Sequence, residues 1–391
     1  MSLYIIYKGV FMKHRVTKLL LVAFIFFSVS IVTFVSCSSE ESAKGPIKIG
    51  VSGPYTGDLA SYGIPSRKAA ELVVEAKNAA GGILDREIEL VIEDDVCKAE
   101  VASNVAAKLV GEEVVAVLGH ICSGATTAAA GIYNSSEILL ISPSATTPEL
   151  TLSGDYPNFL RTISRDDSQA KLITDFALDT LGAKKIAVLH DKDAYGKGLA
   201  EFVQQFVEAD SRAEVVLFEG ITAGAVDYSS IINKVKSVEA DVIVYGGYHP
   251  EASKLVTQGK KAGLDIPFVS DDGVKDDTFI KVAGEYAEGV YASGPIDTTQ
   301  SPEAQAAINA HKEKYGEDPG AFFLNAYAAM EALLNGIEKA KSTEYDKVMA
   351  AIKGNFVNTP LGSISFDENG DAIGIGFAMF QVQNGAYAEA E

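Results

Sequence analysis

The sequence predicts an α/β fold with two successive doubly wound domains, each built around a parallel sheet. Short apolar strands alternate with amphipathic helices almost throughout the chain, which is the pattern of βαβ units. This alternation restarts after Arg161, and about 350 residues follow the N-terminal apolar segment, enough for two domains of ordinary size. Because parallel strands are joined by helical crossovers, we expect helices on both faces of each sheet.

The first domain begins with strands and helices in turn. The segment 66–80 is predicted to be a helix that ends at Gly81-Gly82, since glycine is typical just after a helix C-terminus. Apolar and polar residues alternate over 87–93, which predicts a strand. The expected strands are 47–51, 87–93, 114–118 and 138–141, and the expected helices are 66–80, 99–110 and 124–133.

The second domain repeats this pattern, and the tail after it differs. Its expected strands are 186–189, 215–218, 242–245 and 268–270, and its expected helices are 168–181, 195–209, 229–237 and 251–262. The tail contains two long helices, 301–315 and 321–339, a short helix at 346–353 and strand-like segments at 364–366 and 378–382. We expect the long helices to complete the first domain.

The N-terminal segment 1–37 has the layout of a secretory signal peptide. Basic residues precede the run 19–35, which has no charged residue, and Cys37 follows. Phe34-Val35-Ser36-Cys37 resembles a lipobox with Phe34 in place of the usual leucine, which implies that Cys37 carries a lipid anchor. The alternative is an uncleaved anchor helix, because the run is almost long enough to span a bilayer. Both alternatives place the rest of the chain outside the cytoplasm.

The chain is strongly acidic, with a formal net charge of −20. Residues 1–37 contain four basic and no acidic residues, so the remainder carries −24. Such a surface repels nucleic acid and anionic lipid, so we expect no nucleic-acid partner and no membrane contact except through the lipid anchor. Tryptophan is absent, which removes the usual stacking platform for sugars or bases.

Cys97 and Cys122 remain after Cys37 is assigned to the signal. An even pair in an oxidising compartment predicts a disulfide, which would stabilise the fold by about 3–4 kcal/mol. The alternative is two buried free thiols. The five histidines are too scattered for a recognisable metal site, and we expect no cofactor.

Catalytic motifs are missing from the sequence. It has no G-x-S-x-G elbow, no Walker loop and no G-x-G-x-x-G after a strand. Cys122 and His120 could form a nucleophile pair only if the thiol were free. We therefore expect a binding protein and not an enzyme.

The loops after the predicted strands suggest a ligand with two charges. In open α/β sheets ligands bind at the carboxyl ends of the strands. Loops 119–127 and 142–148 are small, polar and uncharged, and their hydroxyls and free amides at helix N-termini suit a carboxylate, although ordinary N-capping is the alternative. Loops 190–196, 246–250 and 271–273 offer tyrosines and carboxylates, with a solvated turn as the alternative for Asp271 and Asp272. Together the two sets predict a zwitterion site.

Several of these stretches resemble the periplasmic leucine/isoleucine/valine-binding proteins, the receptors of branched-chain amino-acid ABC importers. The resemblance runs from about Ile47 to the C-terminus. It is carried by 93–97, 119–123, 143–150, 190–192, 195–200, 220–224 and 245–251. The resemblance implies a type I periplasmic-binding fold whose two doubly wound lobes are joined by a three-strand hinge and close on the ligand. The lobes would be 46–165 with 296–376, and 166–295 with 377–391.

The resemblance also implies roles for single residues. Ser123 would bind the α-carboxylate, and Thr146 would bind both the carboxylate and the α-ammonium. Asp272 would bind the ammonium, although the related proteins typically have the longer glutamate there. The remaining implied contacts are backbone groups of Ser144 and Ala145, closure from the second lobe by Tyr195 and Tyr248, and a side-chain pocket bordered by Tyr62, with a disulfide between Cys97 and Cys122.

The expected function is that of a monomeric, extracytoplasmic solute-binding protein, either in the periplasm or lipid-anchored on the extracytoplasmic face of a membrane. It would capture leucine, isoleucine or valine and deliver it to ABC permease subunits. A ligand-sensing module of the same fold that signals to a membrane receptor is the alternative, and a secreted enzyme would require a free Cys122.

Overall fold

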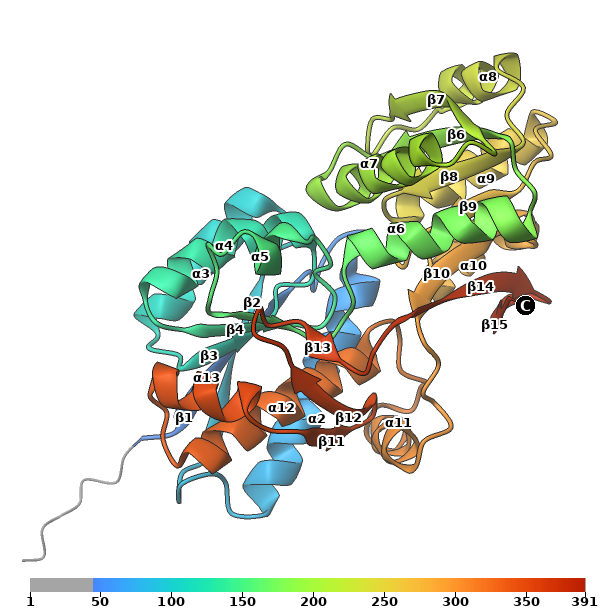
Figure 1. The fold of residues 1–391 in the computed structure, drawn as a ribbon. Helices are drawn as coiled ribbons and strands as arrows, with labels where there is room; N and C mark the ends of the chain where they lie inside the picture. The colour runs from blue at the N-terminus through green and yellow to red at the C-terminus, as the bar shows by residue number, and fades with distance from the viewer. Residues whose placement is uncertain (1–44, 391) are drawn as a thin grey trace, which may run out of the picture. The chain divides into compact units, whose positions relative to one another are not determined.

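Two separate β-sheets organise the computed structural model, which describes residues 45–390 (Figure 1). The predicted signal peptide and Cys37 lie outside the described residues. None of the helices in 45–390 is both long and apolar enough to cross a membrane. The predicted α/β class with parallel sheets is confirmed for this part of the chain.

The first sheet has five strands in the order β2-β1-β3-β4-β5, and all neighbours are parallel. The prediction gave four of them and missed β5, a strand of three residues that ends at Arg161. The strands are β1 (Ile47–Gly53), β2 (Ile88–Asp94), β3 (Ala116–Leu118), β4 (Leu139–Ser142) and β5 (Phe159–Arg161). The helices between them are α2 (Ala60–Ala79), α3 (Ala99–Gly111), α4 (Ser123–Ser135) and α5 (Glu149–Leu152). Helix α2 begins six residues before the predicted start at Ser66, and Pro65 lies within it.

The second sheet has seven strands in the order β15-β14-β10-β9-β8-β6-β7. Strands β6 to β10 are parallel to their neighbours, and β14 and β15 extend the sheet in antiparallel pairing. The prediction missed β10 and α10, which follow the candidate acidic loop. The strands are β6 (Lys185–His190), β7 (Glu214–Gly220), β8 (Val242–Gly246), β9 (Phe268–Ser270), β10 (Tyr291–Pro295), β14 (Phe377–Gln383) and β15 (Ala386–Glu389). The helices are α6 (Asp166–Asp175), continued by a π-helical turn, α7 (Ala194–Ala209), α8 (Ser229–Ser237), α9 (His249–Lys261) and α10 (Asp277–Ala283).

The tail returns to the first sheet before it ends in the second. Helix α12 packs its apolar face on α2 and on strands β3 and β4, in a core that contains Ile49, Ala70 and Leu333 (Figure 1). The tail elements are α11 (Pro302–Tyr315), α12 (Phe323–Ala340), α13 (Tyr345–Lys353) and a small sheet of β11 (Val357–Thr359), β12 (Gly362–Phe366) and β13 (Ala372–Ile373). The chain therefore passes between the two sheets three times, after β5, after β10 and after β13.

Candidate ligand-binding site

The loop between β3 and α4 forms the first part of the site. Gly119 has a positive φ of 133°, and a Cβ there would overlap the carbonyl oxygen of Ser52, so only glycine fits. Helix α4 then begins at Ser123, whose side chain is buried at the helix N-terminus. The Ser123 hydroxyl oxygen accepts a hydrogen bond of 3.3 Å from the backbone N–H of Thr146. Ser123 thus joins the two loops that the sequence singled out.

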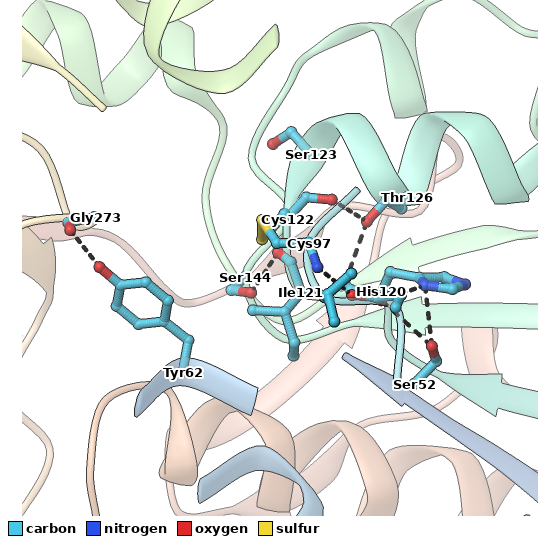
Figure 2. Close-up of a disulfide and its surroundings, with 12 residues drawn as sticks. Ser52, Tyr62, Cys97, His120, Ile121, Cys122, Ser123, Thr126, Ser144 and Gly273 are labelled. Carbon is cyan, nitrogen blue, oxygen red and sulfur yellow. Dashed lines mark hydrogen bonds and ion pairs between the residues drawn. A yellow bond between two sulfur atoms is a disulfide. The ribbon is translucent and has the colours of Figure 1, made fainter. Parts of the chain in front are cut away.

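The disulfide between Cys97 and Cys122 links this loop to the segment that follows β2 (Figure 2). It confirms the predicted pairing and excludes free thiols at these positions. The neighbouring His120 ring is fully buried and contacts Asp95 at 2.6 Å and Ser52 at 3.1 Å. The nucleophile-pair alternative for Cys122 and His120 is therefore wrong, because the sulfur is bonded and the imidazole serves a buried structural network.

A second loop, which follows β4, is held in place by the buried Arg161. Its guanidinium donates to the carbonyl oxygens of Ala145 at 3.1 Å and Thr147 at 3.0 Å, on either side of Thr146. Arg161 also pairs with Asp371 at 2.5 Å, and burial lowers its pKa. Sequence reasoning missed this role, because Arg161 lies 14 residues beyond the loop that it supports.

Two hydroxyls of this second loop, those of Ser142 and Ser144, also form hydrogen bonds within the protein. Ser142 donates to the His120 carbonyl oxygen at 2.6 Å and accepts from the Ala145 N–H at 2.9 Å. Ser144 donates to the Ile121 carbonyl oxygen at 2.7 Å (Figure 2). The two loops of the first sheet therefore form one hydrogen-bonded unit.

The opposite wall of the site carries the acidic residues. Asp271 and Asp272 follow β9 and are 0% and 3% exposed, so the solvated-turn alternative for them is wrong. One Asp272 oxygen accepts a hydrogen bond from the Tyr195 hydroxyl, whose ring centroid lies 5.4 Å from that of Tyr248. Burial raises the pKa of Asp272, while the hydrogen bond from Tyr195 opposes this shift. Asp271 instead accepts from the Gly247 N–H at 2.9 Å and so supports the neighbouring loop.

Contacts across the cleft join the two walls. The Tyr62 hydroxyl on α2 donates to the Gly273 carbonyl oxygen at 2.5 Å, a contact visible in Figure 2. Beside it, Ser61 Oγ lies 3.2 Å from His249 Nε2. The Tyr62 ring also packs near Phe322, at a centroid distance of 5.8 Å. The cleft is closed in this conformation.

A small cavity of about 20 Å³ lies between the walls. Six of the eight predicted ligand residues line this cavity, whereas Ala145 and Thr146 are buried and are not among its lining residues. The lining consists of Tyr62, Ile121, Cys122, Ser123, Ser144, Tyr195, Tyr248, Asp272, Gly273 and Phe322. Sequence reasoning missed Phe322, which reaches the site from the distant tail, and nothing in its local sequence marks it.

Within residues 45–390, no three histidine, cysteine or acidic side chains form a group that could hold a metal ion. The arrangement suits non-covalent binding: hydroxyl and amide groups stand on one wall and a carboxylate on the other. Lysine and arginine do not occur among the residues that line this cavity. A ligand with one carboxylate, one cation and a small apolar body fits this chemistry.

Comparisons with known proteins agree with this geometry. Residues 46–386 match the family model described as periplasmic binding protein. The chain is 40% identical over 344 residues to the leucine-, isoleucine-, valine-, threonine- and alanine-binding protein of Pseudomonas aeruginosa, and the match covers 88% of this chain and 92% of that protein. It is 37% identical over 346 residues to the Leu/Ile/Val-binding protein of Escherichia coli, with 88% and 93% covered.

Solved structures are similar as well. A leucine-binding protein from Thermotoga maritima superposes with a TM-score of 0.82 at 28% identity, over 88% of this chain and 98% of that chain. The substrate-binding protein of a branched-chain amino-acid transporter from Streptococcus pneumoniae, in complex with isoleucine, gives a TM-score of 0.79 at 32% identity, over 88% and 100%. The predicted type I periplasmic-binding fold is confirmed by these structures.

Proposed function

Because this chain belongs to the periplasmic binding protein family, we propose that it is the amino-acid receptor of an ABC importer. Its ligand is a free amino acid with a branched aliphatic side chain, which it delivers to the permease from outside the cytoplasm. The names of the relatives and the isoleucine in one solved relative support this ligand class.

One observation carries the proposal: uncharged donors on one wall of a closed cleft face a buried carboxylate on the other. Ser123 and the Thr146 N–H supply hydroxyl and amide groups at the N-terminus of α4, which favours a carboxylate. Asp272 stands opposite and supplies the charge for an ammonium. When the ligand enters, its carboxylate replaces the Ser123 oxygen as the acceptor of the Thr146 N–H.

The side-chain half of the cavity is apolar. Ile121, Phe322 and the rings of Tyr62 and Tyr248 border it, and these groups would reject a charged side chain because burial of an unpaired charge is costly. Among aliphatic side chains, however, one methylene changes the binding free energy by only about 1–3 kcal/mol. We therefore expect binding of leucine, isoleucine and valine within a narrow range of affinity.

Hinge opening is part of the proposed cycle. The cavity of about 20 Å³ is too small to hold an amino acid, so the lobes would separate to admit one. The proposed lobes are 46–165 with 296–376, and 166–295 with 377–391. They would rotate about a hinge formed by the three segments that pass between the two sheets. Solution scattering should show a smaller radius of gyration with leucine than without it.

Export and anchoring complete the proposal for the N-terminus. Cleavage before Cys37 and its acylation would tether a monomeric receptor beside its permease. Mass spectrometry of the mature protein should show a lipid-modified Cys37 as its first residue. An unmodified or uncleaved N-terminus would contradict the anchoring proposal and leave the binding proposal unaffected.

A ligand screen tests the central claim. A thermal-shift assay with the twenty amino acids, followed by calorimetry, should show binding of leucine, isoleucine and valine and none of aspartate or lysine. Failure of all small apolar amino acids to bind would contradict the proposal. Loss of leucine uptake on deletion of the gene would support transport, whereas unchanged uptake would favour the sensing alternative.

A further inference from the structure

A histidine contact joins the two walls of the cleft beside Tyr62. Ser61 lies on α2, in the proposed lobe that contains 46–165, and its Oγ is 3.2 Å from Nε2 of His249, the first residue of α9 in the other proposed lobe. The Tyr62 ring packs edge-on against the imidazole, at a centroid distance of 5.4 Å. In the closed cleft the start of α2 therefore covers this ring, and separation of the lobes would uncover it.

The imidazole of His249 is buried, and one of its nitrogens has no partner. The residue is 3% exposed, and Nδ1 has no hydrogen-bond partner among residues 45–390. A neutral ring can carry its single proton on Nε2, donate it to Ser61 and leave Nδ1 bare. A protonated ring carries a second N–H at Nδ1, and a buried donor without an acceptor is costly. The closed cleft thus favours the neutral ring over the charged one.

Two carboxylates from other elements act on the ring. Asp276 lies buried in the loop after β9, and Asp58 is exposed just before α2. Both raise the pKa of His249, but burial has the larger effect and lowers this pKa below its ordinary value of about 6.5. The Asp276 carboxylate already accepts a hydrogen bond from the Thr278 N–H at 2.6 Å. The two acids therefore do not offset the burial of the ring.

Other titratable groups near the ring have partners of their own or stay neutral. Burial raises the pKa of the Tyr62 and Tyr248 hydroxyls, which are therefore uncharged near pH 7. On α9 itself, the Glu251 carboxylate accepts a hydrogen bond of 2.9 Å from the Gly224 N–H, in the loop after β7. Closure of the cleft thus opposes protonation of the imidazole, whereas an open cleft would expose the same ring to water.

We propose that Ser61 and His249 form a pH-sensitive latch, in which the neutral ring holds the cleft closed on the ligand and protonation of the ring favours the open cleft. The direction follows from the two states. Above about pH 6.5 the ring is neutral in both, whereas below this pH an exposed ring takes up a proton that closure must remove. Acid therefore weakens ligand binding. This inference rests on the proposed function, because it assumes a ligand on which the lobes close.

Calorimetry with L-leucine at pH 7.5 and pH 5.5 tests the latch. At pH 5.5 an exposed ring is protonated in about nine of ten molecules. The wild-type Kd should therefore rise about tenfold more than the Kd of His249→Gln, whose amide can still donate to Ser61 but does not titrate. If the wild-type rise exceeds that of the variant by less than about threefold, the latch is refuted.

His311→Gln is the matched control. His311 is also buried, and burial lowers its pKa. Its Nδ1 lies 3.0 Å from the Glu317 carbonyl oxygen, and its ring packs on Tyr315 and Phe323, all of which belong to the proposed lobe segment 296–376. Its burial should not change when the cleft opens, so this variant should keep the wild-type pH dependence. Loss of that dependence here as well would contradict the proposal.

Ser61→Ala tests the other half of the latch. It removes the hydroxyl that contacts the ring and should weaken leucine binding at pH 7.5 by about threefold or more, with an unchanged circular dichroism spectrum. A variant with wild-type affinity would show that this contact does not hold the cleft closed, and the latch would be abandoned.

Two further results have defined meanings. If circular dichroism shows that His249→Gln is unfolded, His249→Asn takes its place, with the same threefold threshold. If the wild type binds no amino acid at either pH, the proposed function fails and the latch fails with it. Normal wild-type binding at pH 7.5, with the same pH dependence in the wild type and the His249 variant, instead refutes the latch alone.

Discussion

The two walls of the cleft differ in how completely their polar groups are used. On the first wall, the Ser142 and Ser144 hydroxyls and the carbonyls around Thr146 are joined to each other or to Arg161. On the second wall, Asp272 holds one hydrogen bond from Tyr195, and its other oxygen lacks a donor within 45–390. The wall proposed to bind the carboxylate thus satisfies its own polar groups, whereas the wall proposed to bind the ammonium leaves one acceptor open.

This difference separates stability from affinity. Groups that are satisfied inside the protein hold the first wall rigid, so changes there should mainly lower the free energy of unfolding. A buried carboxylate without a cation lowers the stability of the fold. This loss is offset only when a ligand binds. Changes on the second wall should therefore mainly lower affinity.

The largest effect is expected from Arg161→Met. It removes a buried charge that supports two carbonyls and pairs with Asp371, so the free energy of unfolding should fall by about 4 kcal/mol in urea denaturation. Arg165→Met, at a partly exposed position in the same charge cluster, should cost no more than about 1 kcal/mol. Equal losses in both variants would show that Arg161 has no special role in the first wall.

The disulfide should contribute nearly as much. The double variant Cys97→Ser, Cys122→Ser opens a loop with a sequence separation of 25, and the free energy of unfolding should fall by about 3 kcal/mol. Reduction of the wild type with dithiothreitol should reproduce this loss, whereas the double variant should not respond to it. If the loss is below about 1 kcal/mol, the hydrogen bonds alone hold the loop.

On the second wall, Asp272→Ala should weaken leucine binding by about 2 kcal/mol, or roughly thirtyfold in Kd, with little loss of folding stability. Calorimetry measures the affinity. Asp265→Ala is the control. Asp265 is exposed and precedes the N-terminal end of β9, whereas Asp272 follows its C-terminal end. Unchanged affinity in Asp272→Ala would refute the assignment of the ammonium partner.

The last prediction concerns how the stability of the protein without ligand depends on pH. The pKa of Asp166 is raised to about 8 in the folded protein, against about 4 in the unfolded chain, so the folded state binds this proton more tightly. Its contribution to stability is present below pH 4 and is lost as the pH rises toward 8. Asp166→Asn should therefore gain stability relative to wild type by about 1 kcal/mol or more between pH 5 and pH 8 in thermal denaturation. A pH-independent difference would show that Asp166 does not titrate.

The sequence predicted what depends on local pattern and missed what depends on distant contacts. Long alternating segments gave most of the strands and helices, but β5 and β10 are short and were not recognised. Ser123 followed from the chemistry of its loop and helix N-terminus. Asp166 looks like an ordinary exposed acid in the first turn of a helix, and only the fold around it makes it buried.

Arg161 and Phe322 were missed for a related reason. Each reaches the site from another part of the chain, and no spacing rule connects them to the loops that they contact. The resemblance to a known family supplied residue roles that physical reasoning alone left open, including those of Tyr62 and Tyr248.

The three passages of the chain between the sheets also determine the order in which the protein can fold during synthesis. The core under β1 includes Leu333 on α12 and Phe366 on β12, so almost the whole chain must be made before that core can close. Proteins whose domains are continuous in sequence can fold one domain at a time from the N-terminus. Here the core of the first sheet includes tail residues, so we expect this core to stay open until late in translation. Late folding would suit the proposed export, because a chain whose core is still open can be threaded through a narrow secretion channel.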